Sequence, residues 1–359
     1  MADSKQAPLD AAAAAKAAFA SVQDMPFPND IFTAPELRWA VIGCGVIANQ
    51  MAQSLALAGR KLAGVANRTL SKAQAFAEQY GVEKVYETVE DLYADPDIDA
   101  VYITTPHNMH ITYLRAALAA GKHVLCEKAI TLNSAELDEA RAIADDHNVV
   151  LMDATTVLHM PLYQELRRRM DAGDFGRMNL VQLNFGSYKE YGDLTNRFYN
   201  RSLAGGAMLD IGVYALSVMR LFMASQPVEV VSLGNTCETG VDVAGGIVCR
   251  NAEQQLGVVS LTLHSKQPKR SVISFDNCYV EVNEYPRADH ATIVWTADGH
   301  REEVAAGTEA YALCYEMADL EKAVAGDDSK RELLDYASDV MELMTKLRAD
   351  WGVVYPEEE

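Results

Sequence analysis

The chain has 359 residues, of which 49 % are hydrophobic and 23 % are charged, a globular composition long enough for about two domains. Its 31 basic and 51 acidic residues give a formal net charge of −20 at pH 7, so nucleic acid and anionic lipid surfaces would be repelled. A small molecule is therefore the expected partner. Six scattered cysteines form no CxxC pair, which favours reduced thiols in a cytoplasm.

Residues 1–36 are predicted to form an N-terminal arm. Its alanine-rich start favours helix, and the proline-punctuated stretch "DMPFPNDIFTAP" favours a loop. The start lacks the basic and continuous apolar regions of a secretory signal, and no run approaches the roughly 20 apolar residues of a membrane helix. We therefore expect a cytoplasmic protein that does not bind a membrane.

From residue 37 to residue 155, short apolar runs alternate with amphipathic helical stretches. This alternation is typical of a parallel sheet built from strand–helix–strand units, and it predicts a doubly wound Rossmann domain of the α/β class. The predicted strands are 37–43, 61–67, 84–87, 99–105, 123–128 and 149–154, and the predicted helices are 46–58, 71–80, 88–94, 108–120 and 134–147.

Residues 156–359 have a different pattern, which predicts a second domain of α+β type. After a helix at 161–172 and a glycine-rich helical stretch, β-prone segments follow one another between turn residues, which indicates an open, mostly antiparallel sheet. Helices are expected again at 309–325 and 329–347. We expect at least one of them to pack back on the first domain.

The stretch "AVIGCGVIA" contains a G-x-G-x-x-A motif between the first strand and the first helix. Gly43 permits a tight turn, Gly45 lets the backbone approach a pyrophosphate, and Ala48 permits close helix–strand packing. The N–H groups at the start of this helix, from Val46 and Ile47, would face the anion. The motif therefore predicts dinucleotide binding, whereas a tight turn alone would be the simpler interpretation.

The end of the second strand favours NADP over NAD. NAD-specific sites usually place a carboxylate here for the ribose 2′-hydroxyl, but this chain has Asn67, Arg68 and Thr69, with Lys72 close behind. Arg68, Thr69 and Lys72 are suited to a 2′-phosphate. Alternatively, Arg68 is a solvated loop charge and the enzyme accepts either cofactor.

Two further clusters end the fourth and fifth strands, where ligands bind in such sheets. The stretch "TTPHNMH" contains Thr104, Thr105, Pro106, His107 and His110, and "CEKA" contains Glu127 and Lys128. We expect these residues to border the cofactor. No carboxylate or cysteine accompanies the two histidines at metal-ligand spacing, so no metal is expected, and His110 is interpreted as a capping or cofactor-contacting imidazole.

Asp210 and Tyr214 are four residues apart on a stretch that reads as helix, which places them on one face. Hydride transfer at a carbinol carbon needs a group that takes or gives the hydroxyl proton. Tyr214 suits this role if a cation such as Lys128 stabilises its phenolate, or Lys128 polarises the substrate oxygen itself. The simpler alternative is an exposed aspartate beside a half-buried aromatic residue.

Three stretches together resemble the glucose-fructose oxidoreductase, inositol dehydrogenase and rhizopine-catabolism (Gfo/Idh/MocA) family: "AVIGCGVIA", "VYITTPHNMHITYLRAALAAGKHVLCEKAITLN" and "RFYNRSLAGGAMLDIGVYAL". The resemblance spans residues 37–348. It implies a nicotinamide oxidoreductase that forms a homodimer or homotetramer through its C-terminal sheet. It also implies that Lys128 is the catalytic lysine, Asp210 the conserved aspartate and Tyr214 the acid/base residue. Tyrosine at position 214 resembles the branch with glucose-fructose oxidoreductase and dimeric dihydrodiol dehydrogenase, which commonly uses NADP.

Ala129 departs from the family's Glu-Lys-Pro motif, in which a cis peptide bond commonly precedes the proline. Either the Lys128–Ala129 bond is trans and the lysine is re-aimed, or the cis form is kept although a non-proline residue disfavours it. We expect an active site in which the loop that carries Lys128 and Ala129, called the lysine loop below, is slightly relaxed.

The sequence thus predicts an NADP-preferring oxidoreductase acting on a secondary alcohol or ketone of a sugar, polyol or cyclic diol. Lys128, Asp210, Tyr214 and Arg197, with Tyr188 and Tyr191, are expected to meet the substrate. Two alternatives remain open: a glycoside-processing oxidoreductase with tightly held cofactor, and a dinucleotide-binding regulator without catalysis.

Overall fold

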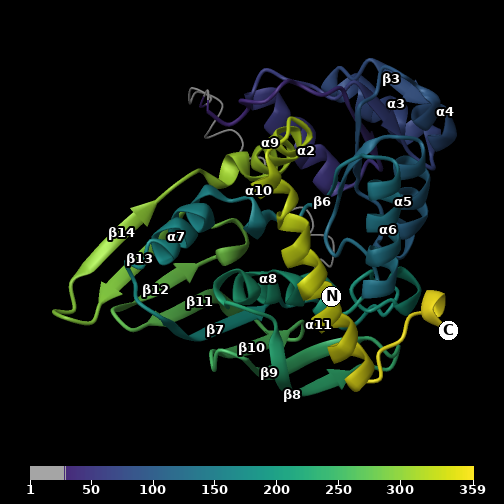
Figure 1. Cartoon of the computed structure of the whole chain (residues 1–359). Helices are drawn as coiled ribbons and strands as arrows, with labels where there is room; N and C mark the ends of the chain where they lie inside the picture. The colour runs from purple at the N-terminus through teal and green to yellow at the C-terminus, as the bar shows by residue number, and fades with distance from the viewer. Residues whose placement is uncertain (1–27, 29) are drawn as a thin grey trace, which may run out of the picture.

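The computed structural model describes residue 28 and residues 30–359, and its two sheets lie side by side with helices between them (Figure 1). The predicted helical part of the N-terminal arm lies outside the described residues. The rest of the chain has the predicted architecture: a parallel Rossmann sheet followed by a larger, mostly antiparallel sheet.

The first sheet has six parallel strands in the order β3-β2-β1-β4-β5-β6, so the prediction of a doubly wound sheet is confirmed. Strands β1, β4 and most of β5 are buried on both faces, as parallel strands covered by helices must be. The strands are β1 (Trp39–Ile42), β2 (Gly64–Ala66), β3 (Lys84–Tyr86), β4 (Ala100–Ile103), β5 (His123–Cys126) and β6 (Leu151–Asp153). The helices are α2 (Val46–Leu57), α3 (Leu70–Tyr80), α4 (Val89–Ala94), α5 (His110–Ala119) and α6 (Ser134–Asp146).

The second sheet has eight strands in the order β14-β13-β12-β11-β7-β10-β9-β8. Its β7–β10 pair is parallel and its other pairs are antiparallel, which confirms the predicted mostly antiparallel sheet. The strands are β7 (Met178–Gly186), β8 (Pro227–Thr236), β9 (Asp242–Asn251), β10 (Leu256–Thr262), β11 (Gln267–Phe275), β12 (Cys278–Asn283), β13 (His290–Trp295) and β14 (Arg301–Ala305). Buried and exposed residues alternate along most of them, because one face packs on helices and the other does not.

The helices of the second part join the two sheets (Figure 1). Helix α8 packs on β7, α11 packs on both α8 and α6, and α9 packs on α2, so the expectation that a late helix returns to the first domain is confirmed. These helices are α7 (Pro161–Asp171), α8 (Val213–Phe222), α9 (Ala312–Val324), α10 (Asp328–Arg331) and α11 (Leu333–Asp350). The stretch Arg201–Phe222 is long and apolar enough to cross a membrane, contrary to our expectation, but its apolar window is 83 % buried, as in a core helix.

Glu321 connects helix α9 to the start of strand β1. Its buried carboxylate accepts hydrogen bonds from Trp39 Nε1 at 3.0 Å, from the main-chain N–H of Leu37 at 3.2 Å and from Arg60 at 2.6 Å. The Arg60 side chain is itself largely buried and its second partner, Glu36, is exposed, so Glu321 is its main source of compensating charge.

We predict that Glu321→Ala lowers the free energy of unfolding by about 3–5 kcal/mol, because it leaves the Arg60 guanidinium buried without its main partner. Asp350→Ala is the matched control, since it breaks the exposed Lys346–Asp350 pair and should cost less than about 1 kcal/mol. Urea denaturation of both variants measures the difference. Equal losses would contradict a structural role for the buried pair.

Candidate active site

The loop between β1 and α2 is shaped to receive a phosphate. Gly43 has a φ of +104°, and a Cβ there would lie 2.6 Å from Oγ1 of Thr104, so only glycine fits this turn. No atom lies within 4 Å of the Cβ position of Gly45, which is the N-cap of α2. The first turn of α2 carries no acidic residue and no side-chain cap, and the Val46 side chain is 77 % exposed. This open, uncapped helix start fits the pyrophosphate of a dinucleotide.

The loop after β2 presents the predicted basic residues to solvent. Arg68, Thr69 and Lys72 are exposed at the start of α3, while the Asn67 side chain donates to the carbonyl oxygen of Thr69 at 3.0 Å. Within the described part of the chain, neither Arg68 nor Lys72 forms a salt bridge. Both cations therefore remain available for a 2′-phosphate.

Lys128 follows β5 and reaches across to the second domain. Its Nζ donates to the main-chain oxygen of Asp210 at 2.6 Å and lies 3.3 Å from the Asp210 Oδ1. The Lys128–Ala129 peptide bond is cis. The alternative of a trans bond with a re-aimed lysine is therefore wrong, and so is the relaxed lysine loop that we expected.

Asp210 lies in a different kind of helical turn from the one predicted. Residues Met208–Gly212 form a turn of π-helix that leads into α8, so Asp210 and Tyr214 are not one regular α-turn apart. The buried Asp242 accepts the N–H of Met208 at 2.6 Å and so holds the start of this turn. Such π-helical turns frequently occur at functional sites.

Tyr214 completes the group, with Lys128 Nζ 4.9 Å from the centre of its ring. Burial raises the pKa of Tyr214, and the Lys128 ammonium lowers it by a smaller amount. Our expectation that Lys128 brings the tyrosine pKa below its usual value is therefore wrong for the net effect. The phenol is protonated at neutral pH, which suits it to donate a proton.

The charges of Lys128 and Asp210 support each other. Burial opposes ionisation of Asp210, but the positive charges of Lys128, Arg197 and Lys189 hold the pKa of this carboxyl at about 2. Burial likewise opposes the Lys128 cation, yet Tyr214 and Asp210 keep its pKa above the usual value. At neutral pH the site therefore contains a lysine cation beside an aspartate anion.

The ring nitrogens of the two histidines contact main-chain oxygens of the lysine loop. His107 places its ring nitrogens 3.1 Å from the carbonyl oxygen of Ala204 and 3.2 Å from that of Lys128. His110 is fully buried, with its ring nitrogens 3.0 Å from the Ala129 oxygen and 2.8 Å from the Thr105 oxygen. Both rings thus face main-chain carbonyls, and the prediction that His110 contacts the cofactor gives way to a positioning role. Burial lowers the pKa of His107 to about 3, so its ring is neutral.

Three of the residues predicted to meet the substrate, Tyr188, Tyr191 and Arg197, lie on the loop after β7. Arg197 is the member that reaches the site, with Nη2 3.5 Å from Oδ1 of Asp210. Tyr191 packs against Tyr199, and Tyr188 is exposed. Sequence reasoning missed Lys189 on this loop, although its place between the two predicted tyrosines was a usable signal.

Glu127 is half-buried and is one of two neighbouring carboxyl groups. It accepts a hydrogen bond from the Tyr102 hydroxyl, and Glu316 on α9 lies near it. Burial and the charge of Glu127 together raise the pKa of Glu316 to about 8. Arg287, which sequence reasoning also missed because nothing in its turn signals it, lies near enough to lower the pKa of both carboxyls.

The C-terminal segment, residues 353–359, forms hydrogen bonds that stabilise the loops around the site. The buried Arg348 binds Glu358 at 2.8 Å and the carbonyl oxygen of Leu132, just after the lysine loop, at 2.5 Å. The Tyr355 hydroxyl donates to the Gly205 oxygen at 2.6 Å. The segment therefore contacts both the loop after Lys128 and the loop before Asp210.

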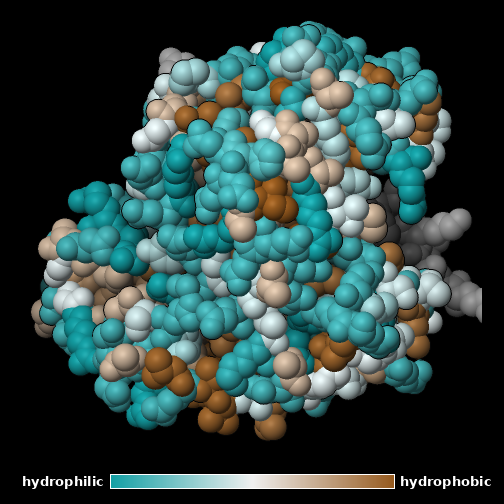
Figure 2. Space-filling model, turned by 45° about the vertical axis from the view of Figure 1, so that its right-hand side comes forward, coloured by the Kyte–Doolittle hydropathy of each residue, from teal (hydrophilic) through white to brown (hydrophobic). Residues whose placement is uncertain are grey.

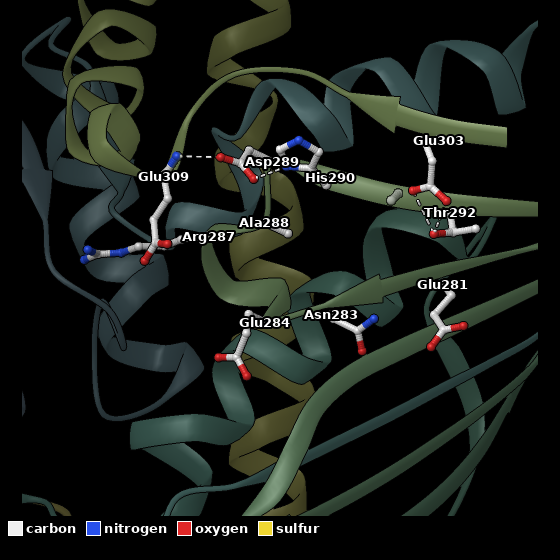
Figure 3. Close-up of a pocket in the computed structure, with 11 residues that line it drawn as sticks. Glu281, Asn283, Glu284, Arg287, Ala288, Asp289, His290, Thr292, Glu303 and Glu309 are labelled. Carbon is white, nitrogen blue, oxygen red and sulfur yellow. Dashed lines mark hydrogen bonds and ion pairs between the residues drawn. The ribbon is translucent and has the colours of Figure 1, made fainter. Parts of the chain in front are cut away.

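A pocket of about 190 Å³ lies between the short 3₁₀ helix η5 (Tyr285–Arg287) and strands β12 to β14 (Figure 3). Arg287 extends from this pocket towards Gln50 of α2, with both terminal nitrogens 3.3 Å from its side-chain oxygen. Lys128, Asp210 and Tyr214 are not among its lining residues.

Comparison with known proteins agrees with this geometry. Residues 37–155 match the model of an oxidoreductase family with an NAD-binding Rossmann fold, and residues 163–281 match the Gfo/Idh/MocA C-terminal domain. The trans-1,2-dihydrobenzene-1,2-diol dehydrogenase of Xenopus tropicalis is 31 % identical over 242 residues, which cover 66 % of this chain and 72 % of that protein. The pig protein of the same name is 28 % identical over 341 residues, or 90 % of this chain and 99 % of that one.

Solved structures share the fold. A 3-ketoreductase from Actinomadura kijaniata, in complex with NADP and TDP-benzene, has a TM-score of 0.75 at 24 % identity, covering 88 % of this chain and 98 % of that one. The aldose-aldose oxidoreductase from Caulobacter crescentus, complexed with glycerol, has a TM-score of 0.78 at 22 % identity, covering 88 % and 97 %.

The buried carboxyl of Glu316 predicts a pH-dependent stability. Its pKa is about 8 in the folded chain and near 4.5 in a solvated carboxyl, so between these values the folded chain holds a proton that the unfolded chain has lost. The free energy of unfolding therefore falls as the pH rises from about 4.5 to about 8. Glu316→Gln removes this titration. The difference in melting temperature, variant minus wild type, should therefore be larger at about pH 8.5 than at about pH 5.5. Scanning calorimetry at both pH values tests this, with the exposed Glu342→Gln as control. A difference that stays constant with pH would contradict it.

Proposed function

The chain belongs to the Gfo/Idh/MocA family of oxidoreductases, and from this premise we propose that it is an NADP-preferring dehydrogenase/reductase of a sugar, polyol or cyclic diol. The observation that carries the proposal is the Lys128 ammonium group held between Asp210 and Tyr214. The dihydrodiol dehydrogenases among its relatives support a secondary alcohol or its ketone as the reacting group. Arg68 and Lys72, which form no salt bridge with the residues that the structure describes, support NADP.

Each part of the site has one task in this reaction. A nicotinamide cofactor, when bound along the loop from Gly43 to Ala48, supplies or accepts the hydride. Lys128 polarises the substrate oxygen, since its ammonium group is fixed by the oxygens of Asp210. Asp210 compensates the buried cation and orients it. The loops after β1, β4 and β5 hold the reacting groups at one edge of the sheet.

Tyr214 handles the proton. In the reducing direction its protonated phenol donates the proton to the carbonyl oxygen as hydride reaches the carbonyl carbon. In the oxidising direction the phenolate takes the hydroxyl proton back, and the Lys128 cation stabilises that phenolate. Because burial raises the pKa of Tyr214, oxidation should require a higher pH than reduction.

We predict that Tyr214→Phe lowers kcat about 10²–10⁴-fold, because the acid/base group is lost, while the Kd for NADP changes little. Turnover is measured by NADPH absorbance and cofactor binding by fluorescence titration. Tyr279→Phe, which removes a half-buried hydroxyl on β12, is the control. Unchanged turnover in Tyr214→Phe would remove the tyrosine from the mechanism.

We also propose that two copies associate through the open face of the second sheet. Hydrophobic side chains gather at the lower edge of the molecule, where β8 and β9 lie (Figure 2). Val231 and Leu233 of β8 are strongly exposed, and Val248 of β9 is paired with Val231, so these side chains lie on one face. An apolar surface of this kind in a chain with a net charge of −20 supports burial by a second copy.

We predict that Val231→Glu with Leu233→Glu converts the protein to monomers, because two charges would be buried in the interface. Ala75→Glu, on the exposed side of α3, is the matched control and should leave the assembly intact. Light scattering after size-exclusion chromatography measures the mass. A wild-type monomer, or an oligomer that survives the double substitution, would overturn this interface.

The compartment that we propose is a reducing one such as the cytoplasm. All six cysteines are free thiols, and four of them, Cys126, Cys249, Cys278 and Cys314, are buried.

A further inference from the structure

Two cations near the reacting groups lie against one aromatic ring, and both come before that residue in the sequence. Lys189 Nζ and Arg197 Cζ each lie 4.1 Å from the centre of the Phe198 ring. Phe198 is half-buried, so both cations gain a cation–π contact there. The same ring thus gathers two like charges next to Asp210.

The negative charge near these cations is too small to balance them. Asp210 is the shared counter-ion, at 3.3 Å from Lys128 Nζ and 3.5 Å from Arg197 Nη2. Lys189 forms no salt bridge within residues 30–359, and burial together with the neighbouring cations lowers its pKa. Within residues 30–359, Asp210 is thus the one carboxylate that forms a salt bridge with any of these three cations, in a chain whose net charge is −20.

Hydrogen bonds and close packing fix the backbone of the loop that carries the two cations. The hydroxyl of the buried Tyr199 donates to the carbonyl oxygen of Lys189 at 2.9 Å, and the N–H of Gly206 donates to the carbonyl oxygen of Phe198 at 2.9 Å. A Cβ on Gly205 would lie 2.5 Å from the oxygen of Arg197, so glycine is needed for this close approach. The loop is therefore packed against the turn that carries Asp210, and like charges held in advance lower the cost of binding an anion.

The pocket of Figure 3, which lies outside the site, is mostly acidic. Lys269, whose Nζ lies 5.6 Å from the Phe185 ring, is neutralised by Glu284 at 2.7 Å. Glu284 also lines this pocket, together with the carboxylates of Glu281, Asp289, Glu303 and Glu309 and the guanidinium group of Arg287. Carboxylates outnumber cations in this pocket, so an anionic group is favoured beside Lys189 and Arg197 instead.

We infer that the substrate is an anionic sugar or polyol, whose carboxylate or phosphate group binds between Lys189 and Arg197 while its secondary alcohol or ketone faces Lys128 and Tyr214. This inference rests on the proposed function for its reaction, but the anion site itself does not depend on turnover. It narrows the substrate class from neutral sugars and diols to acidic ones.

The test compares three related compounds, glucose, glucuronate and glucose 6-phosphate, in the presence of NADP. Wild-type kcat/KM should be at least about ten-fold higher for one of the anionic compounds than for glucose, since a hydrogen bond to a charged group is worth about a factor of ten or more. The carboxylate and phosphate arms distinguish the two anion types. Lys189→Met and Arg197→Met, which keep much of the apolar stem over Phe198, should each reduce this ratio about ten-fold through KM. Lys189→Arg should restore it, and Lys346→Met on the exposed side of α11 should not change it.

Thermal shift with NADPH and each compound separates this inference from the proposed function. Stabilisation by an anionic compound but not by glucose, abolished by Lys189→Met, supports the anion site even if nothing is turned over. Equal effects of all three compounds, or none from any, overturn it. If Lys189→Met weakens NADPH binding as strongly as it weakens anion binding, the two cations serve the cofactor, and the inference is wrong.

Discussion

The Lys128–Asp210 contact joins the two parts of the fold, and the rest of the site depends on it. A buried ammonium group is unstable unless opposite charge and hydrogen-bond acceptors accompany it. Strand β5 brings the lysine to the sheet edge, and a π-helical turn supplies two oxygens of Asp210 from the second part of the chain. The histidines behind the lysine loop, Asp242 behind the turn and the C-terminal segment around both all act to keep these two groups at bonding distance.

Charge is distributed unevenly around this contact. The chain as a whole is strongly acidic, and the carboxyls of Glu127 and Glu316 lie near each other, yet the partly exposed loop after β7 carries the cations Lys189 and Arg197. A substrate oxygen at Lys128 would therefore meet a positive potential on its exposed side. The protonated phenol of Tyr214 lies within the same region, so proton donation and charge stabilisation act on one oxygen.

Much of the fold could be predicted from the sequence, because its signals are local. The alternation of apolar runs and helical stretches gave the Rossmann sheet, and the constraint on Gly43 follows from a turn of a few residues. The link between Lys128 and Asp210 came from family resemblance instead, since no spacing rule connects residues 82 positions apart. The π-helical turn was missed because Asp242, which holds its first N–H, follows 34 positions later. The high pKa of Tyr214 was missed because burial is a property of the packed molecule.

The brace formed by the C-terminal segment has a consequence for how the protein is made. The ribosome synthesises the chain from the N-terminus onwards. The residues of the dinucleotide-binding sheet have therefore all emerged before residues 353–359 are synthesised. During that interval the loops after Lys128 and before Asp210 lack the contacts that Arg348, Tyr355 and Glu358 provide. The loop that would bind the dinucleotide is therefore synthesised well before the last contacts that fix the loops around Lys128 and Asp210 can form.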